Sequence, residues 1–377
     1  MLKIIDFIKS NKNWKTLLSG HPYNLLIKEN DYYYKFNYSQ IESDFSKEMV
    51  QEARGLIVNK STLDVVSMSF KKFFNYGEGF AADIDWKTSR ILEKVDGSII
   101  SIFYDRDKWN IVTNGTLNAF DAPVSMPMNG INNFGELFMD ALEDCKSIQV
   151  IEDIKNNTTK FLRPENTYIF ELVSLLTRVV IQYDKNAIYH IGTRNNNTLQ
   201  ELEVELGIQK PKSYNFNSLE ECIEATKKLI GEEGYVVVDE NYNRIKIKSI
   251  EYLTMHRCRT NGVLTKKRIW ELICTFEHEE YLSYFKDEEK YFLPALEIYN
   301  KTKEDFSLIK NEVISNKDKF ETRKSFVEWA KSNFDPIYLP FVFYILDGKD
   351  NTLTFTKMLG KVGETKWLEK DSLIVNL

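Results

Sequence analysis

The chain has 377 residues, too many for one small domain, and its 43% hydrophobic and 28% charged residues argue against a disordered chain. The net charge of −6 argues against a globally basic nucleic-acid binder, so a site for a polyanion has to be a local basic cleft. The four cysteines form no CxxC pair, which argues against a zinc site or disulfide framework and favours a reducing compartment.

The predicted elements begin with one amphipathic helix and continue as short strands. Apolar residues at helical spacing, interrupted by Lys and Asp, predict a helix within residues 1–20 rather than a signal peptide. Helices are also predicted at 134–144 and 219–230, the latter with Ser218 as N-cap and Glu221 completing a capping box. Strands are predicted at 32–38, 55–58, 65–70, 99–104, 109–113, 168–173, 179–182, 187–191, 235–238 and 244–248, with 105–108 as a hairpin turn.

Beyond residue 250 the strand signals end and helical patterns follow. These predict helices at 266–276, 281–293, 303–315, 323–334 and 337–346. The predicted fold class is therefore α+β: a body of antiparallel sheets with flanking helices over residues 1–250, and an all-helical domain over residues 251–377. No run of 18 apolar residues occurs, so we expect no membrane-spanning segment.

The clearest chemical signal is Glu-Lys-Val-Asp-Gly-Ser at residues 93–98. Lys94 ends one predicted strand, Asp-Gly predicts a tight turn, and a second strand follows at once. A lysine held in this way can serve as a nucleophile. Taken alone, the segment is more often an ordinary hairpin with an incidental lysine, because short motifs match by chance.

Five further segments accompany Lys94 in a fixed order. They are Glu-Ala-Arg-Gly-Leu-Ile at 52–57, Phe-Lys-Lys-Phe-Phe-Asn at 70–75, Ile-Phe-Glu-Leu-Val at 169–173, Glu-Glu-Gly-Tyr-Val-Val at 232–237 and Arg-Ile-Lys-Ile-Lys-Ser at 244–249. The series resembles the covalent nucleotidyltransferase superfamily of ATP-dependent ligases and RNA capping enzymes. In detail it resembles the RNA ligase 1 family of T-even-type phages, over roughly residues 30–255.

The resemblance implies a nucleophile and a set of catalytic groups. Lys94 would attack the α-phosphorus of ATP, expel pyrophosphate and carry AMP as a phosphoramidate. Lys246 and Lys248 alternate along one strand and so share a face, where two cations would neutralise the α-phosphate. The alternative interpretation of Lys246 and Lys248 is an exposed basic face of a strand. Glu233, directly before Gly-Tyr-Val, completes the expected catalytic set, and its alternative is a charged turn residue.

The resemblance also implies nucleotide and metal contacts. Glu233 and Glu171 would bind the divalent cation, Mg²⁺ or Mn²⁺, partly through water, and Glu171 could instead contact the ribose. A carboxylate within an apolar strand needs a partner, so a salt bridge is the alternative for Glu171. The full nucleotide-binding set implied is Arg54, Lys72, Phe74, Glu93, Lys94, Glu171, Lys246 and Lys248.

The sequence leaves an alternative open for two residues of this set and departs from the resemblance at one further position. Lys72 and Phe74 would flank the nucleotide, with Phe74 stacking on adenine, but a core aromatic beside a solvated lysine is the alternative. Thr113-Asn114-Gly115 departs from the resemblance, which places a basic residue before that glycine. Asn114 can hydrogen-bond a ribose or phosphate but carries no charge.

The expected function is ATP-dependent joining of 5′-phosphate and 3′-hydroxyl RNA ends, in RNA or tRNA repair. The helical domain would select RNA, and the expected nucleic-acid contacts are Tyr252, Arg257, Lys266 and Lys267. The alternative for Tyr252 is a place in the site wall, and the alternative for the other three is a solvated helix face. We expect the protein to be a monomer in the cytoplasm, which would be the cytoplasm of the host if a phage encodes the protein. The alternatives are a DNA ligase, a capping guanylyltransferase and a non-catalytic RNA-binding relative.

Overall fold

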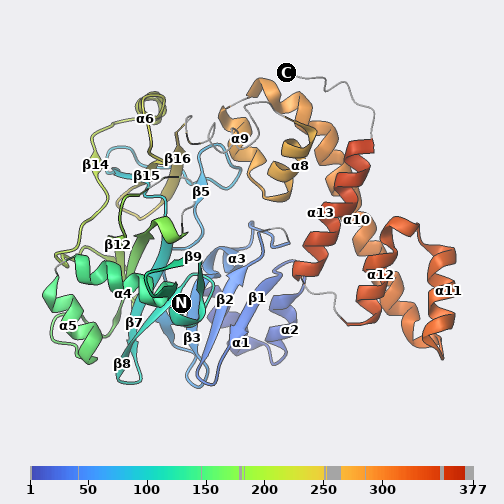
Figure 1. The fold of residues 1–377 in the computed structure, drawn as a ribbon, viewed down its shortest axis with the longest axis horizontal. Coiled ribbons are helices and arrows are strands. Elements are labelled where there is room, and N and C mark those ends of the chain that lie inside the picture. The colour runs from blue at the N-terminus through green and yellow to red at the C-terminus, as the bar shows by residue number, and fades with distance from the viewer. Residues whose placement is uncertain are drawn as a thin grey trace. The chain divides into compact units, whose positions relative to one another are not determined.

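The computed structural model describes residues 2–40, 42–145, 147–177, 181, 183–249, 252, 265–284, 286–348 and 352–369. The chain divides into two compact units, Met1–His256 and Arg257–Leu377, each considered by itself below (Figure 1). Within the described residues, the first unit combines antiparallel sheets with helices and the second consists of helices. The α+β prediction is therefore confirmed. No helix in the described part of the chain is both long and apolar enough to cross a membrane.

The first sheet carries the N-terminal helices on one face. Its order is β1-β2-β3-β4, all antiparallel, and Ile4, Ile5 and Leu18 pack against Phe36 and Leu56. The single helix predicted for residues 1–20 is wrong, because the chain is extended at Asn11 and a second helix starts afterwards. The bounds are α1 Lys3–Ser10, α2 Trp14–Ser19, α3 Glu48–Glu52, β1 Leu25–Glu29, β2 Tyr33–Tyr38, β3 Arg54–Asn59 and β4 Val65–Ser67.

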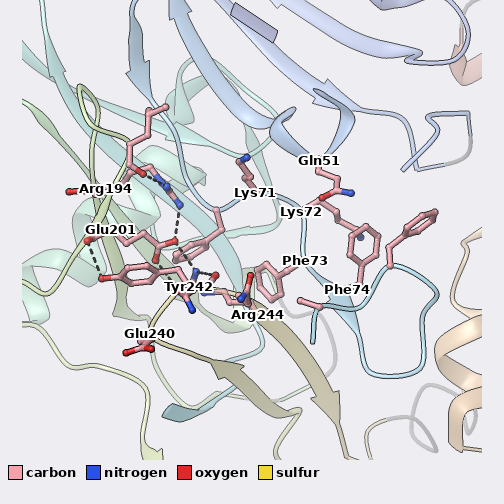
Figure 2. A pocket seen from close by; sticks show the side chains of 17 residues that line it. Gln51, Lys71, Lys72, Phe73, Phe74, Arg194, Glu201, Glu240, Tyr242 and Arg244 are labelled. Carbon is pink, nitrogen blue, oxygen red and sulfur yellow. Dashed lines mark hydrogen bonds and ion pairs between the residues drawn. The ribbon is translucent and has the colours of Figure 1, made fainter. Parts of the chain in front are cut away.

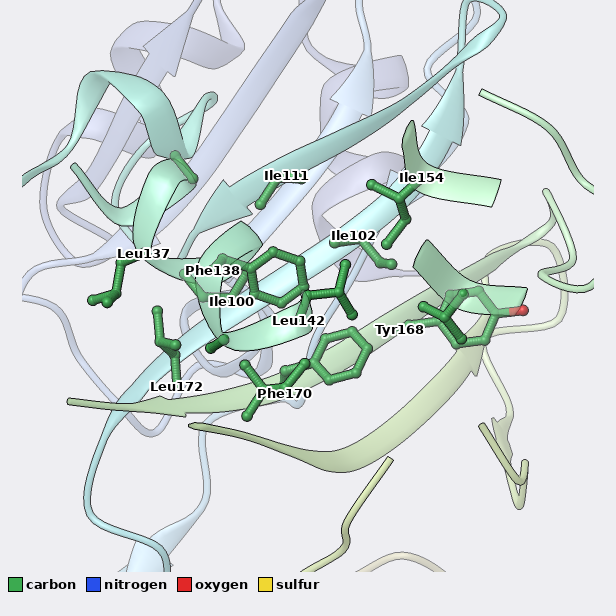
Figure 3. Packing of buried hydrophobic residues seen from close by; sticks show 14 of the residues in the cluster. Ile100, Ile102, Ile111, Leu137, Phe138, Leu142, Ile154, Tyr168, Phe170 and Leu172 are labelled. Atoms are coloured by element: carbon green, nitrogen blue, oxygen red, sulfur yellow. The ribbon is translucent and has the colours of Figure 1, made fainter. Parts of the chain in front are cut away.

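The second sheet has the order β13-β12-β11-β7-β8 and is covered by α4 and α5. Figure 3 shows Phe138 and Leu142 of α4 against Phe170 of β11. The β7–β8 turn is tighter than predicted, since Asp105 pairs with Lys108. The bounds are β7 Ser98–Asp105, β8 Lys108–Thr113, β11 Asn166–Val173, β12 Ala187–Asn195, β13 Glu201–Leu202, α4 Phe134–Asp144, α5 Ile148–Asn156, η1 Ala119–Asp121, η2 Leu175–Thr177 and the hairpin of β9 Pro123–Met128 and β10 Ile131–Asn133.

The third sheet has the order β14-β6-β15-β16-β5, with α6 packed against it. All its pairs are antiparallel except β16 with β5. Ser218 caps α6 as predicted, since its hydroxyl accepts from the Glu221 amide at 3.2 Å. The Glu221 carboxylate accepts from the Asn217 amide instead of closing the box on Ser218. The bounds are β5 Phe74–Asn75, β6 Arg90–Glu93, β14 Ser213–Tyr214, β15 Gly234–Val238, β16 Arg244–Lys248 and α6 Leu219–Thr226.

The connection between β6 and β7 passes from the third sheet to the second. The tight turn predicted at Asp96-Gly97 is therefore wrong: β6 pairs with β14 and β15, whereas β7 pairs with β8 and β11. A Cβ atom at Gly97 would lie 2.4 Å from the Leu172 carbonyl oxygen. Glycine is required at position 97 because two backbones approach each other closely. Lys94 lies where the chain passes from the third sheet to the second.

The helical unit differs from the prediction mainly in α10. Its buried residues Ala295, Tyr299 and Thr302 continue the helical spacing, so the two helices predicted at 281–293 and 303–315 are wrong: one helix joins the last turn of the first to the whole of the second. Helix α13 was not predicted; its Gly360 and Gly363 lower helix propensity. The bounds are α8 Lys266–Cys274, α9 His278–Tyr284, η3 Lys286–Glu288, α10 Glu289–Asn316, η4 Lys317–Lys319, α11 Arg323–Asn333, η5 Pro336–Tyr338, α12 Leu339–Leu346 and α13 Thr352–Glu369. The strand predicted at 179–182 lies, except for Ile181, outside the described residues.

Lys35 of β2 is fully buried and makes the stability of the first unit depend on pH. Burial, with a smaller contribution from Lys28, lowers the pKa of Lys35 from 10.5 to about 7. Between these pH values the unfolded chain binds more protons than the folded chain, so the free energy of unfolding rises with pH, by about 1.4 kcal/mol per unit. Chemical denaturation should show this rise in the wild type relative to Lys35→Met. Parallel pH profiles of the two proteins would contradict the prediction.

Candidate active site

A pocket of about 330 Å³ lies where strands of the second and third sheets meet. All three sheets contribute polar side chains to this pocket. Strand β3 of the first sheet supplies Arg54, β11 of the second supplies Glu171, and β16 of the third supplies Arg244 and Lys246. Apolar walls come from Phe70, Phe73, Leu92, Val95, Ile99, Ile191, Pro211 and Val236, and the remaining lining residues are Glu93, Lys94, Gly97 and Asn114. A concave apolar pocket with a few convergent polar groups is typical of a small-molecule site.

Lys94 follows β6 directly and is fixed at both its backbone and its amine. Its amide donates to the Gly234 carbonyl at 2.8 Å, which continues the pairing of β6 with β15. Its Nζ lies 2.5 Å from Glu233 Oε2. The Glu233 side chain is 3% exposed and that of Lys94 is 21% exposed; Lys94 lines the pocket, and Glu233 lies behind it without lining the pocket itself. The ion pair therefore fixes the direction of the Lys94 amine, and the amine stays accessible from the pocket.

Gly234 joins Glu233 to β15 in a conformation that other residues rarely adopt. Its φ is +142°, and a Cβ atom would lie 2.1 Å from the Ile247 carbonyl oxygen. We expect Gly234→Ala to lower the free energy of unfolding by about 2–4 kcal/mol, because backbone atoms have to move. Gly79→Ala is the control, since a Cβ atom there meets nothing within 4 Å. Equal stability of the two variants in urea would contradict this account of Gly234.

Glu171 faces the pocket because of its place in β11. Phe170 and Leu172 on either side are buried in the core, so alternation turns the partly exposed Glu171 to the other face. Burial raises the pKa of Glu171 to about 7, with Lys94 lowering it and Glu233 raising it. Within the part of the chain that the structure describes, no hydrogen bond reaches this carboxylate.

The face of β16 opposite the core carries three cations. Its alternating burial turns Arg244, Lys246 and Lys248 away from Ile245 and Ile247, as the sequence predicted for the two lysines. Burial, then the charges of Lys72, Lys94 and Arg54, lower the pKa of Lys246 well below its usual value. Lys246 lines the pocket, whereas the Lys248 amine lies 5.5 Å from the centre of the Tyr252 ring.

Arg244 and Phe73 line the pocket although the sequence did not single them out. The period-two pattern that paired Lys246 with Lys248 would also have identified Arg244. Its guanidinium binds the Glu201 carboxylate and lies 4.5 Å from the Phe70 ring centre. The Phe73 ring lies 5.0 Å from the Lys246 amine and 5.5 Å from the Arg54 guanidinium.

Lys72 and Phe74 lie outside this pocket. Phe74 is buried in β5 beside Phe45 and Phe80. The Lys72 amine lies 5.3–5.5 Å from the rings of Tyr38, Phe45 and Phe74. Both residues line a neighbouring pocket of about 740 Å³, which shares Phe70, Phe73 and Arg244 with the first (Figure 2). The aromatic rings that this motif presents at the Lys94 pocket are therefore Phe70 and Phe73 rather than the predicted Phe74.

Arg54 and Asn114 meet at one wall of the pocket. Arg54 Nη1 is buried and has no hydrogen-bond partner among the described residues. Gly55 beside it has a φ of +76°, and a Cβ atom there would lie 2.5 Å from Asn114 Oδ1. A buried donor without a protein partner requires an acceptor from water or a ligand. Arg54 therefore favours a bound group that carries acceptor oxygens.

Asp96 organises the loop behind Lys94. Its Oδ2 accepts from the Ile181 amide at 2.8 Å, and its Oδ1 accepts from the Tyr252 hydroxyl at 3.3 Å. Its own amide donates to the Tyr183 hydroxyl at 3.0 Å. Tyr252 is 3% exposed. The geometry thus supports a structural part for Tyr252 in the site wall rather than the predicted contact with nucleic acid.

The predicted nucleic-acid residues of the helical unit lie at its first described helix. Lys267 is exposed at the start of α8. Lys266 is partly covered: its amine lies 5.1 Å from the Trp367 ring centre and its carbonyl accepts from Trp367 Nε1 at 2.8 Å. Arg257 lies outside the described residues. The nucleic-acid contacts of this unit remain predictions.

The carboxylates present fit a single Mg²⁺ or Mn²⁺ shared with a phosphate ligand. No group of three or more His, Cys, Asp or Glu among the described residues could hold a metal ion by itself. Glu171 lines the pocket and lies close enough to Glu233 for their charges to interact, and Glu171 makes no hydrogen bond in the described part of the chain. Mg²⁺ is commonly bound by one or two carboxylates together with water and substrate phosphates.

A lysine aimed from a strand end into a pocket, with cations opposite and carboxylates beside it, defines the covalent nucleotidyltransferase class of fold. A family profile described as RNA ligase matches residues 52–253, more than half of the chain. The chain belongs to this family, the RNA ligases of the T4 RNA ligase 1 type.

Individual relatives carry similar names. A protein of Autographa californica nuclear polyhedrosis virus, named as a bifunctional polynucleotide kinase/RNA ligase, is 32% identical over 279 residues, which cover 70% of this chain and 39% of that protein. The RNA ligase of Rhodothermus phage RM378 is 24% identical, with 77% of this chain and 79% of that protein covered. A solved archaeal ATP-dependent RNA ligase has a TM-score of 0.47 at 13% identity, with 77% of each chain covered.

Proposed function

We propose that this protein is an ATP-dependent RNA ligase that joins 5′-phosphate and 3′-hydroxyl RNA ends through AMP bound to Lys94. The observation that carries the proposal is the Lys94 amine, fixed 2.5 Å from Glu233 at the edge of a pocket that also presents Lys246, Arg54 and Glu171. Family membership supports RNA as the substrate.

In the first step, the Lys94 amine attacks the α-phosphorus of ATP. A P–N bond forms, the bond to the leaving pyrophosphate breaks, and the proton of the amine is lost to a base. Glu233 holds the amine in its direction, and its carboxylate lies within reach of that proton. Lys246 neutralises the charge that develops on the α-phosphate, because it lines the same pocket from β16, two strands away from β6 in the third sheet. Arg54 offers its unpaired Nη1 to an oxygen of the nucleotide.

A divalent cation, Mg²⁺ or Mn²⁺, bound by Glu233 and Glu171 would supply charge neutralisation on the ATP phosphates. Among the chain's own residues, Phe73 and the apolar wall exclude water and offer a surface for the base.

In the second step, an oxygen of the RNA 5′-phosphate attacks the phosphorus of AMP, the P–N bond to Lys94 breaks and the amine regains a proton. In the third step, a 3′-hydroxyl loses its proton and attacks the RNA 5′-phosphorus, and the bond to AMP breaks so that AMP leaves. Both steps pass through charged phosphates, so the same cations serve them. The helical unit, with Lys266 and Lys267 at the start of α8, is proposed to select structured RNA such as a broken tRNA loop. A monomer acting in the cytoplasm is part of the same proposal.

The test compares nucleotides and nucleic acids in one sealing assay. We expect single-stranded 5′-phosphate RNA to be sealed with ATP and not with GTP. Sealing of nicked duplex DNA in preference to RNA would replace the proposal with a DNA ligase. Labelling by GTP alone would indicate a capping guanylyltransferase, and RNA binding without transfer of any nucleotide would indicate a non-catalytic relative.

A further inference from the structure

Two lysines of the first sheet hold the loop that follows β8. Lys28 of β1 and Lys35 of β2 are direct partners in the antiparallel pair. Lys35 Nζ donates to the carbonyls of Thr113 at 2.7 Å and Thr116 at 2.9 Å. Lys28 Nζ donates to the Gly115 carbonyl at 2.7 Å. Three of the four carbonyls of residues 113–116 therefore accept from lysine amines.

This arrangement is costly for the sheet that contains it. Like charges on directly opposed residues destabilise a strand pair. The Lys35 side chain is fully buried, and no carboxylate pairs with it in the described part of the chain. An apolar side chain of similar length would fill the same space without removing a charge from water. Stability of the first sheet therefore does not account for Lys35.

Among the residues that the structure describes, the other side-chain hydrogen bonds of residues 113–116 are local to the loop. The amides of Gly115 and Thr116 both donate to Thr113 Oγ1, at 3.1 and 3.0 Å, so these bonds close the turn upon itself. The lysines instead connect the loop to another sheet. Between the held carbonyls stands Asn114, which lines the Lys94 pocket and packs against Gly55 next to Arg54.

We propose that Lys28 and Lys35 form a clamp that positions Asn114 against the bound nucleotide, with Lys35 as its main positioning residue. The inference rests on the proposed function. An uncharged amide contributes only through directed hydrogen bonds to ribose or phosphate oxygens, so its contribution depends on where the loop holds it.

A double-mutant cycle on the full chain tests the clamp through the rate of AMP transfer at varied ATP. We expect Lys35→Met to raise the half-saturating ATP concentration roughly tenfold. In an Asn114→Ala background, the same substitution should add less than roughly twofold, because the clamp acts through Asn114. Fully additive effects, or a folded Lys35→Met with wild-type ATP dependence, would overturn the proposal.

Matched controls keep the test decisive. Lys60→Met removes a lysine of the turn after β3 that contacts Glu29 and the Asn30 carbonyl but not the loop, and it should leave the ATP dependence unchanged. If Lys35→Met fails to fold, Lys28→Met, at the exposed end of the clamp, should show a smaller increase of roughly threefold. Wild-type behaviour of Lys28→Met in that case would refute the clamp.

Hydrogen–deuterium exchange separates failure of the clamp from failure of the ligase assignment. Exchange in residues 113–117 should be faster in Lys35→Met than in the wild type and unchanged in Lys60→Met, whether or not AMP is transferred. If the wild type takes up no AMP but the exchange difference is present, the proposed function fails and the loop attachment stands. Equal exchange in all three proteins overturns the clamp itself.

Discussion

Lys94→Ala is expected to abolish transfer of AMP to the protein, by at least roughly 10⁴-fold, because the nucleophilic amine is removed. The variant should retain measurable sealing of RNA that is already adenylated at its 5′ end. In that last step a 3′-hydroxyl would be the nucleophile, and Lys246 and Arg54, which line the pocket, are unchanged. Gel assays with 5′-phosphate RNA plus ATP, and with pre-adenylated RNA without ATP, measure the two activities separately.

Removal of Lys94 also leaves a buried carboxylate without its cation, since the Glu233 side chain is 3% exposed. Lys94→Arg is the matched control, because a guanidinium retains the charge opposite Glu233 but is not a nucleophile. Both variants should lack AMP transfer, and Lys94→Arg should keep the thermal stability of the wild type more closely. Sealing of 5′-phosphate RNA with ATP at the wild-type rate by either variant would refute the assignment of the nucleophile.

Lys246→Met is expected to slow AMP transfer by roughly 10²–10³-fold, the usual cost of removing one preorganised group that stabilises developing charge. Lys246 faces the pocket from β16 with its amine 5.0 Å from the Phe73 ring centre. Methionine keeps the length and apolar stem of the side chain but not the cation. A single-turnover assay of AMP transfer at saturating ATP measures the effect on the chemical step.

Lys212→Met serves as the control for Lys246→Met. The Lys212 side chain, directly before β14, is 67% exposed and 3.9 Å from Glu232, and it does not line the pocket. Its substitution therefore removes one lysine charge without changing the pocket. It should leave the rate within roughly twofold of the wild type. Equal rates for Lys246→Met and the wild type would exclude Lys246 from charge stabilisation.

Local sequence patterns predicted the elements that depend on neighbouring residues. The strand at residues 244–248 alternates Arg, Ile, Lys, Ile and Lys, and its burial alternates in the same way. The Ser218 cap and helix α4 depend on spacing within one turn, and both were predicted correctly. Lys94 was identified from the order of the motifs.

The features that the sequence did not predict depend on contacts between distant segments of the chain. The connection after Lys94 was predicted as a hairpin turn, because nothing local shows that β6 and β7 pair with strands of different sheets. The choice between Phe73 and Phe74 depends on which face of β5 meets the core, and the parallel pairing of Phe74 with Ile245 decides it. Lys35 gave no signal, because its partners are carbonyls about 80 residues further along the chain.

The most direct test of the central claim is mass spectrometry of the protein after incubation with ATP and Mg²⁺, followed by peptide mapping. We expect the intact protein to gain the mass of one AMP and the modified peptide to carry it on Lys94. AMP on another residue, or no AMP on a folded protein that binds ATP, would refute Lys94 as the nucleophile.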